Sequence, residues 1–249
     1  MSGLPSWITE LTDVLRTDRG TLSGADESSR PALSSAAAAA WWPGPAAESP
    51  PAAGAVTLDV VHAWHLRTVL PLLTEATALS GRATAPLARL AAAHERARET
   101  ETVGEEEWFE VLEPVLRQVY RDAYGFQRAF AAAYENARAY ALANGHGAAG
   151  AHQYATDYAE LTTEPNTRAF AEANALANAR AVAAAYATGD AEALARTYPA
   201  ARTRAYARAL ATGTAREPRA DDALFAAAYT ELVHGLRSAL NTAPVGPPP

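Results

Sequence analysis

Alanine dominates this chain of 249 residues, where it occupies 64 positions. It loses no side-chain rotamer freedom in a helix and has the highest helix propensity of all residues. The residues that favour strands are scarce, with one Ile and 12 Val in the whole chain. The sequence therefore predicts an all-α protein.

The apolar core that this composition can build is thin. Hydrophobic residues make up 49% of the chain, but about half of them are alanine, which leaves roughly 58 larger side chains. A buried methyl group contributes about 0.8 kcal/mol, against about 2 kcal/mol for a large apolar side chain. Helices that approach each other closely over small side chains are the arrangement that such a chain favours.

The sequence contains neither lysine nor cysteine. Their absence excludes a P-loop lysine, a Schiff-base amine, a thiolate nucleophile, a disulfide and a sulfur-ligated metal. Any catalysis must therefore use His, carboxylate, Tyr, Ser, Thr or Arg side chains. The sequence assigns no catalytic residue.

The sequence also bears on location. No window approaches about 18 consecutive large apolar residues, and the N-terminus lacks the basic start and apolar run of a signal peptide. We expect a cytoplasmic protein with no membrane partner.

Changes in composition divide the chain into four segments. Residues 1–18 are predicted to form an N-terminal amphipathic helix, and residues 19–56 an Ala/Pro/Gly/Ser-rich linker. Residues 57–242 are predicted to be an all-helical body, and residues 243–249 a Pro-rich tail. The expected fold is a multi-helix bundle or a short helical-repeat array with a tethered N-terminal amphipathic helix.

Glycines and prolines mark the expected helix ends. Pro71 and Pro114 should kink or divide the helices in which they lie. An Arg-Ala-aromatic motif recurs at residues 128, 168 and 204, at offsets that helical-repeat units also have. Alanine-rich sequences produce such matches by chance, and chance similarity is the more ordinary interpretation. The predicted helices of the body cover 57–79, 86–100, 105–144, 148–161, 166–188, 191–212 and 221–241.

Two groups of residues could ligate a metal ion. Asp59, His62 and His65 follow one another at spacings of three, and Glu231 and His234 form a Glu-x-x-His motif on the last predicted helix. Carboxylate-bridged metal bundles use such motifs from two helices, together with glutamates from two others. No particular inner glutamate is indicated, so separate histidines satisfied by hydrogen bonds or solvent are the more ordinary interpretation.

Large apolar residues near the N-terminus could bind a partner. A tethered amphipathic helix is a common form for docking into a groove, and exposed large apolar groups usually mark interaction sites. The alternative is that the helix folds back on its own body. The predicted partner-binding residues are Trp7, Ile8, Leu11, Leu15, Trp41 and Trp42.

A series of aromatic residues recurs at intervals of three to six residues along the predicted helix 105–144. Such a stripe is typical of a helix face that packs in the core. The residues concerned are Tyr120, Tyr124, Phe130 and Tyr134, with Tyr154 and Tyr158 on the next helix.

The charge distribution argues against nucleic-acid binding. The formal net charge is −7, and the first 113 residues carry 16 acidic residues against eight arginines. An arginine-rich stretch over 196–219, including Arg202 to Arg208, could bind phosphate. Pairing of this stretch with the seven glutamates of 99–113 is at least as natural.

The residues together favour a helical interaction, scaffold or regulatory protein without catalytic activity of its own. The alternative is a helical-bundle enzyme or small-molecule-binding protein, with a metal at His62, His65, Glu231 and His234 as one form of it. We expect a protein partner and no nucleic acid, whereas the sequence indicates neither a cofactor nor an oligomeric state.

Overall fold

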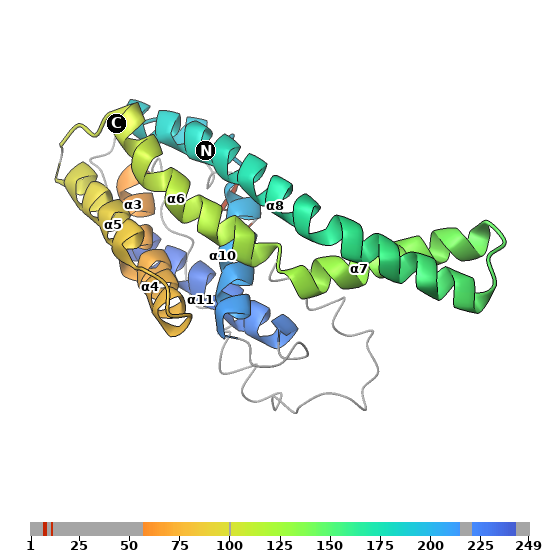
Figure 1. Cartoon of the computed structure of the whole chain (residues 1–249). Helices are drawn as coiled ribbons and strands as arrows, with labels where there is room; N and C mark the ends of the chain where they lie inside the picture. Colours follow the sequence, from red (N-terminus) through yellow and green to blue (C-terminus); the bar gives the residue numbers. More distant parts are fainter. Residues whose placement is uncertain (1–6, 9–10, 12–56, 100, 215–220, 243–249) are drawn as a thin grey trace, which may run out of the picture.

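The computed structural model describes residues 7–8, 11, 57–99, 101–214 and 221–242. Regular structure in these residues is helical, without a β-strand, which confirms the predicted all-α class. The elements are α3 (Leu58–Trp64), the π-helical turn η3 (His65–Val69), α4 (Leu70–Leu79), α5 (Ala85–Arg98), α6 (Glu105–Ala123), α7 (Phe126–Ala143), α8 (Ala148–Thr188), α9 (Ala191–Ala195), α10 (Pro199–Thr214) and α11 (Asp221–Thr242) (Figure 1).

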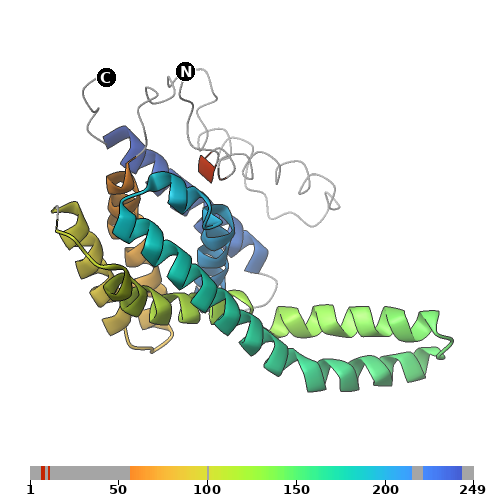
Figure 2. The same cartoon turned by 90° about the horizontal axis from the view of Figure 1, so that it is seen from above.

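The helices form a bundled body and an arm that projects from it. The arm is α7 together with residues 148–165 of α8, and both views show it extending away from the other helices (Figures 1 and 2). The rest of α8 returns along α6 into the body, so one helix belongs to both parts.

Alanines at every fourth position let α8 approach its neighbours closely. Each has no exposed surface, whereas a large side chain at the same place would hold the helices apart. In the arm, Ala137 and Ala141 of α7 are also buried. The buried alanines of α8 at this spacing are Ala151, Ala155, Ala159, Ala171, Ala175, Ala179 and Ala183.

The prediction that this region contains two helices, 148–161 and 166–188, is wrong, because α8 is continuous through Pro165. Proline removes one backbone hydrogen bond and usually kinks a helix. The alanine-lined contacts on both sides of Pro165 hold the helix together, and α8 changes direction between the arm and the body (Figure 2).

The division predicted at Pro114 is also wrong. Pro114 lies inside α6, which runs on to Ala123, and the chain breaks at Tyr124 and Gly125 instead. The reason is that the apolar face of α6 continues across the proline and is buried on both sides of it. Its buried residues are Trp108, Val111, Leu112, Val115, Leu116, Val119 and Tyr120.

The disturbance predicted at Pro71 is present one turn earlier, as the π-helical turn between α3 and α4. This turn crosses α11 at very short range. Trp64 Nε1 donates to the carbonyl oxygen of Leu232 at 2.8 Å, and Thr68 lies directly against Gly235. The crossing fixes the first described helices of the body on the last one.

The repeat interpretation is not supported by the helix positions. The motif at residue 128 lies near the start of α7, the motif at 168 lies in the middle of α8, and the motif at 204 lies in α10. The three copies therefore do not occupy equivalent places in a repeated unit. The body is a helical bundle.

The prediction that the aromatic stripe lies in the core holds for Tyr120 but is wrong for three other members. Tyr120 is 5% exposed, whereas Tyr124, Tyr154 and Tyr158 are 39%, 37% and 44% exposed. Helical spacing places such residues on one face, but it does not determine whether another helix covers that face.

Gly235 provides a test of the helix crossing. Replacement of Gly235 by alanine is expected to lower the free energy of unfolding by about 1–3 kcal/mol, the usual cost of overpacking. The added Cβ would clash with Oγ1 and Cγ2 of Thr68 and would lie 2.6 Å from its Cβ. Urea unfolding followed by circular dichroism measures the change.

The matched control is Gly150→Ala, which is also a substitution within a helix. An added Cβ at Gly150 meets no atom closer than 3.7 Å, so improved helix propensity should leave the stability unchanged or raise it. Equal effects of the two substitutions would contradict the close crossing.

Candidate functional site

Three histidines meet in the core of the body. His62 and His65 come from α3 and the start of η3, and His94 comes from α5. Their exposed fractions are 5%, 3% and 0%. The Nδ1 atoms of His62 and His94 are 2.9 Å apart, and the His65 ring stacks on His94 with centroids 4.7 Å apart. We call these three residues the histidine cluster.

Aromatic rings from three further helices enclose the histidine cluster. Trp108 of α6 lies parallel to His62 at a centroid distance of 5.7 Å. Tyr186 of α8 contacts His62 at 5.0 Å and Trp108 at 4.8 Å. Tyr206 of α10 meets the His65 ring edge-on at 6.3 Å. The cluster is therefore sealed by large side chains.

Burial keeps these histidines neutral. It lowers the pKa of His62 to about 4, although the nearby Asp59 carboxylate acts in the opposite direction. It lowers the pKa of His65 to about 3 and that of His94 well below its ordinary value. Desolvation is the largest cause in each case, because a charged imidazole loses its hydration inside the protein.

The hydrogen bonds of the histidine cluster leave polar atoms without partners. His65 Nδ1 donates to the carbonyl oxygen of Val61 at 2.8 Å, and one of the two rings of His62 and His94 donates its Nδ1 proton to Nδ1 of the other. His94 Nε2 and the hydroxyl group of Tyr186 are buried, and neither has a hydrogen-bond partner in the described part of the chain. Such atoms are uncommon, since most buried polar groups are hydrogen-bonded.

The structure brings only part of the predicted metal set together. His62 and His65 lie in the histidine cluster, whereas Glu231 and His234 are exposed on α11. Asp59 is bonded to Arg98 at 2.7 Å. Within the described ranges, no three His, Asp or Glu side chains are arranged to hold a metal ion.

His94 was not singled out from the sequence, although a signal was available. Leu87, Leu90 and His94 follow one another at helical spacings of three and four, and all three are buried. A histidine on the apolar face of a helix is a residue that the core must accommodate. Its meeting with His62 depends on how α3 and α5 pack, which periodicity does not reveal.

The described residues of the predicted partner-binding set are buried in the protein's own core. Trp7, Ile8 and Leu11 are 3%, 2% and 0% exposed, and Tyr229 donates a hydrogen bond to the carbonyl oxygen of Leu11. The burial of these three residues agrees with the alternative that the N-terminal segment folds back on its own body. In this arrangement their side chains are not available to a partner. Leu15, Trp41 and Trp42 lie outside the described residues.

The arginine stretch does not form one exposed basic surface. Arg202 is buried, and Arg208 lies over the Phe225 ring, with Cζ 3.8 Å from its centroid. The glutamates of 99–113 form ion pairs with nearby arginines, since Arg96 bonds to Glu101 and Glu107. The expected pairing of the two stretches is not among these contacts.

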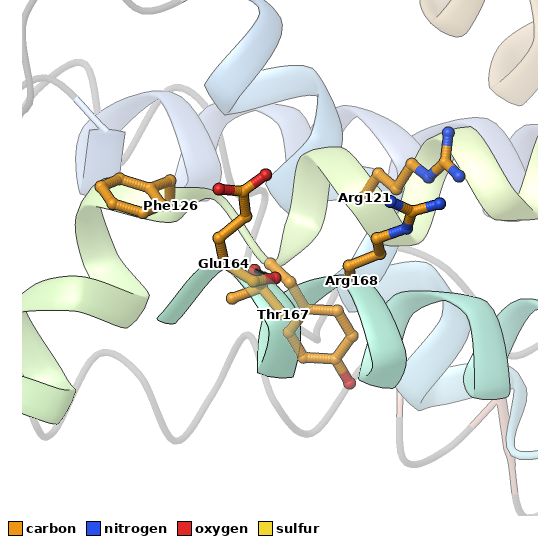
Figure 3. A pocket seen from close by; sticks show the side chains of 6 residues that line it. Arg121, Phe126, Glu164, Thr167 and Arg168 are labelled. Carbon is orange, nitrogen blue, oxygen red and sulfur yellow. Dashed lines mark hydrogen bonds between the residues drawn. The ribbon is translucent and has the colours of Figure 1, made fainter. Parts of the chain in front are cut away.

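A cleft of about 540 Å³ opens where the arm joins the body, and we call it the root cleft (Figure 3). Its walls come from the end of α6, the start of α7 and the middle of α8. The residues that line it are Arg121, Tyr124, Phe126, Glu164, Thr167 and Arg168.

Two guanidinium groups at one end of the root cleft share a carboxylate. Nη2 of Arg121 and Nε of Arg168 each donate to Oε1 of Glu172 at 3.2 Å. Both bonds lower the pKa of the Glu172 carboxyl group, and the bond from Arg168 has the larger effect. Arg121 and Arg168 together carry two positive charges, of which Glu172 neutralises one. The Glu164 side chain lies toward Phe126, at the other end of the cleft (Figure 3).

Comparison with family models, with curated proteins and with solved structures finds no match to this chain. Among its described helices, none combines the length and the apolar character needed to cross a membrane.

The histidine cluster predicts that acid destabilises the fold. The folded-state pKa values of His62 and His65 lie below the ordinary value of 6.5, so the unfolded chain binds more protons as the pH falls. The stabilising contribution is complete above pH 6.5 and decreases below it. At pH 5.5, each of these two histidines is expected to lower the free energy of unfolding by about 1 kcal/mol relative to pH 7.5. Urea unfolding between pH 7.5 and 5 measures the change.

Replacement of His94 by phenylalanine should reduce this pH dependence, because one titrating group is removed while a ring of similar size remains. The control is His146→Gln, since His146 is exposed at the tip of the arm. The explanation fails if His94→Phe and His146→Gln leave the same pH dependence as the unmodified chain.

Proposed function

We propose that the protein is a helical interaction or scaffold protein without catalytic activity of its own, and that the arm carries the surface that meets a protein partner. The observation that carries this proposal is a set of large exposed side chains on the arm. Tyr140, Tyr154, Tyr158 and Leu161 are 61%, 37%, 44% and 77% exposed. We call these four residues the arm face.

The arm face is continuous rather than scattered. Tyr154, Tyr158 and Leu161 follow the i, i+4, i+7 spacing of one helix stripe. The ring of Tyr154 lies 6.2 Å from that of Tyr140 on α7 and 6.2 Å from that of Tyr158. Contiguous exposed apolar side chains usually mark an interaction site.

The composition of the arm explains why a partner would bind there. Its interior seam consists of alanines such as Ala141 and Ala155, which bury little apolar area. Tyrosine is enriched among the residues that dominate binding energies at protein interfaces. A partner helix packed on the arm face would bury large side chains that the two arm helices leave exposed.

The burial of the histidine cluster supports a non-catalytic function. Histidine is the commonest general acid or base in enzymes, but it must reach the substrate to act. His62, His65 and His94 are at most 5% exposed, so a ligand in solvent does not touch them. Their surroundings favour a structural contribution to the core.

A triple substitution on the arm tests the proposal. Tyr154→Ala, Tyr158→Ala and Leu161→Ala together should abolish co-purification of the partner from the native host. The purified partner should bind the variant at least about tenfold more weakly, because each residue supplies exposed apolar area to the interface. Affinity purification followed by titration of the purified pair measures this.

The matched control replaces Leu79 and Leu176 by alanine, since these leucines are 68% and 43% exposed on α4 and on the body part of α8. The control should retain the partner. All of these positions are exposed, so both variants should keep their thermal midpoints. Equal binding by the arm variant and the control would overturn the proposal.

The root cleft favours a second candidate function, the binding of a small molecule. Arg121 and Arg168 supply guanidinium donors, and Phe126, which is 49% exposed, supplies an aromatic surface. A ligand with a carboxylate and an apolar ring matches this arrangement, because guanidinium groups bind carboxylates with charge-assisted hydrogen bonds.

Benzoate is a suitable probe for the root cleft, with benzyl alcohol as its uncharged counterpart. Saturable benzoate binding, followed by NMR of the isotope-labelled full chain, is expected to weaken about tenfold in Arg121→Gln and in Arg168→Gln. Arg117→Gln, which alters an exposed arginine paired with Glu113, should leave binding unchanged. Equal binding of benzyl alcohol and benzoate would argue against recognition of the carboxylate.

A further inference from the structure

The two ends of the root cleft carry opposite chemistry. Arg121 and Arg168 stand at one end, and their guanidinium groups are hydrogen-bond donors only. The Glu164 side chain stands at the other end, beside Phe126, and a carboxylate is an acceptor only (Figure 3). All four residues line the same cavity, so one bound molecule meets both ends.

The hydroxyl group of Thr167 adds a second acceptor to the cleft. Its proton is already used inside α8, since Oγ1 donates to the carbonyl oxygens of Thr163 at 2.8 Å and of Glu164 at 3.0 Å. The oxygen atom keeps lone pairs that accept hydrogen bonds. Thr167 lines the cleft three residues after Glu164, a spacing that places both side chains on one side of the helix. Both therefore offer acceptors to a ligand.

Helix geometry keeps the two ends apart. Glu164 and Arg168 lie four residues apart on α8, which is about 6 Å along the helix axis. Arg168 extends further in the same direction, because its Nε donates to Glu172, another four residues along the helix. A ligand with both of its charges on one carbon atom does not reach both ends. A ligand that does so carries its charges on opposite sides of a spacer.

Aromatic side chains line the same cleft and favour a flat apolar spacer. Tyr124 stacks on Tyr120 with centroids 6.3 Å apart, and its hydroxyl group accepts a hydrogen bond from Asn174 at 3.3 Å. The ring of Phe126 lies 5.8 Å from that of Phe130. Tyr124 and Phe126 are nevertheless exposed. Their rings present apolar surface that is already held by neighbouring side chains.

We propose that the root cleft binds an aromatic carboxylate that also carries an ammonium group on the opposite side of its ring. This inference rests on the second candidate function, the binding of a small molecule. The ligand carboxylate accepts hydrogen bonds from Arg121 and Arg168. The ring packs against Phe126, and the ammonium group donates to Glu164 and to Oγ1 of Thr167.

The Glu164 carboxylate is the reason why the ligand carries a cation. When the carboxylate of a simple ligand such as benzoate meets Arg168, its ring lies toward Phe126 and covers part of Glu164 (Figure 3). Covering a charged group removes water from it, which costs free energy unless a partner takes the place of the water. An ammonium group on the ring supplies that partner. Glu164 thus selects among aromatic carboxylates.

Two probes that differ in one group test the proposal. Para-aminomethylbenzoate carries an ammonium group where para-hydroxymethylbenzoate carries a hydroxyl group. The first is expected to bind the full chain about fivefold more tightly at pH 7 and low ionic strength, since an exposed ion pair has at most about this effect and salt weakens it. NMR titration of the isotope-labelled chain measures both affinities. Equal affinities would overturn the proposal.

The variant Glu164→Gln keeps the size of the side chain and removes its charge, so it should abolish the preference between the two probes. The matched control is Glu160→Gln, because Glu160 is exposed one turn earlier on α8 and is not among the residues that line the cleft. The control should keep the preference, whereas Arg168→Gln should weaken both probes equally. All three positions are exposed, so the variants should fold.

The outcomes separate this proposal from the one on which it rests. Saturable benzoate binding that weakens in Arg121→Gln, together with equal affinities for the two probes, would support the small-molecule site and refute the selection of an ammonium group. The absence of saturable binding by benzoate and by both probes would refute both proposals. A preference that persists in Glu164→Gln would also refute this one. A preference that is lost in Glu164→Gln and kept in Glu160→Gln supports it.

Discussion

The close approach of α8 to its neighbours is the contact on which the rest of the structure depends. Alanines at every fourth position, such as Ala155 and Ala175, have no exposed surface, so backbones rather than side chains come together there. This seam pairs α8 with α7 in the arm and with α6 in the body. It also holds the helix together through Pro165, where sequence rules predict a break. The high alanine content thus has a structural role beyond helix propensity.

Small side chains along α8 are complemented by large ones at the centre of the body. Trp108 and Tyr186 fill the space beside the histidine cluster, and their rings lie 4.8 Å apart. Aromatic and imidazole rings bring large contact areas, but they also bring polar atoms that need partners. The unpartnered atoms of His94 and Tyr186 show that this demand is not fully met by the described residues. The same centre therefore supplies both packing and acid sensitivity.

The sequence predicted the local features of this protein better than the contacts between its helices. Alanine abundance and the scarcity of Ile and Val led to the all-α class, and spacing placed His62 and His65 on one side of a helix. Which helix meets them is a property of the packed bundle, so His94 was missed, and Glu231 and His234 are exposed instead. Periodicity likewise placed Tyr154 and Tyr158 on one stripe, but it does not say whether another helix covers them. Sequence rules predict breaks at Pro114 and Pro165, because the burial that continues on both sides of each proline is not visible in the sequence.

The length of α8 has a mechanical consequence. Its 41 residues span about 60 Å, and the helix runs without interruption from the tip of the arm to the core. Tyr186, beside the histidine cluster, lies in its last turn, while Tyr154 lies in its second turn. The body part of α8 is held along α6, whereas the arm projects from it, so a sideways force on the arm acts first at the bend near the middle of α8 (Figure 2). Because the helix is continuous through this bend, the arm and the ring of Tyr186 belong to one element.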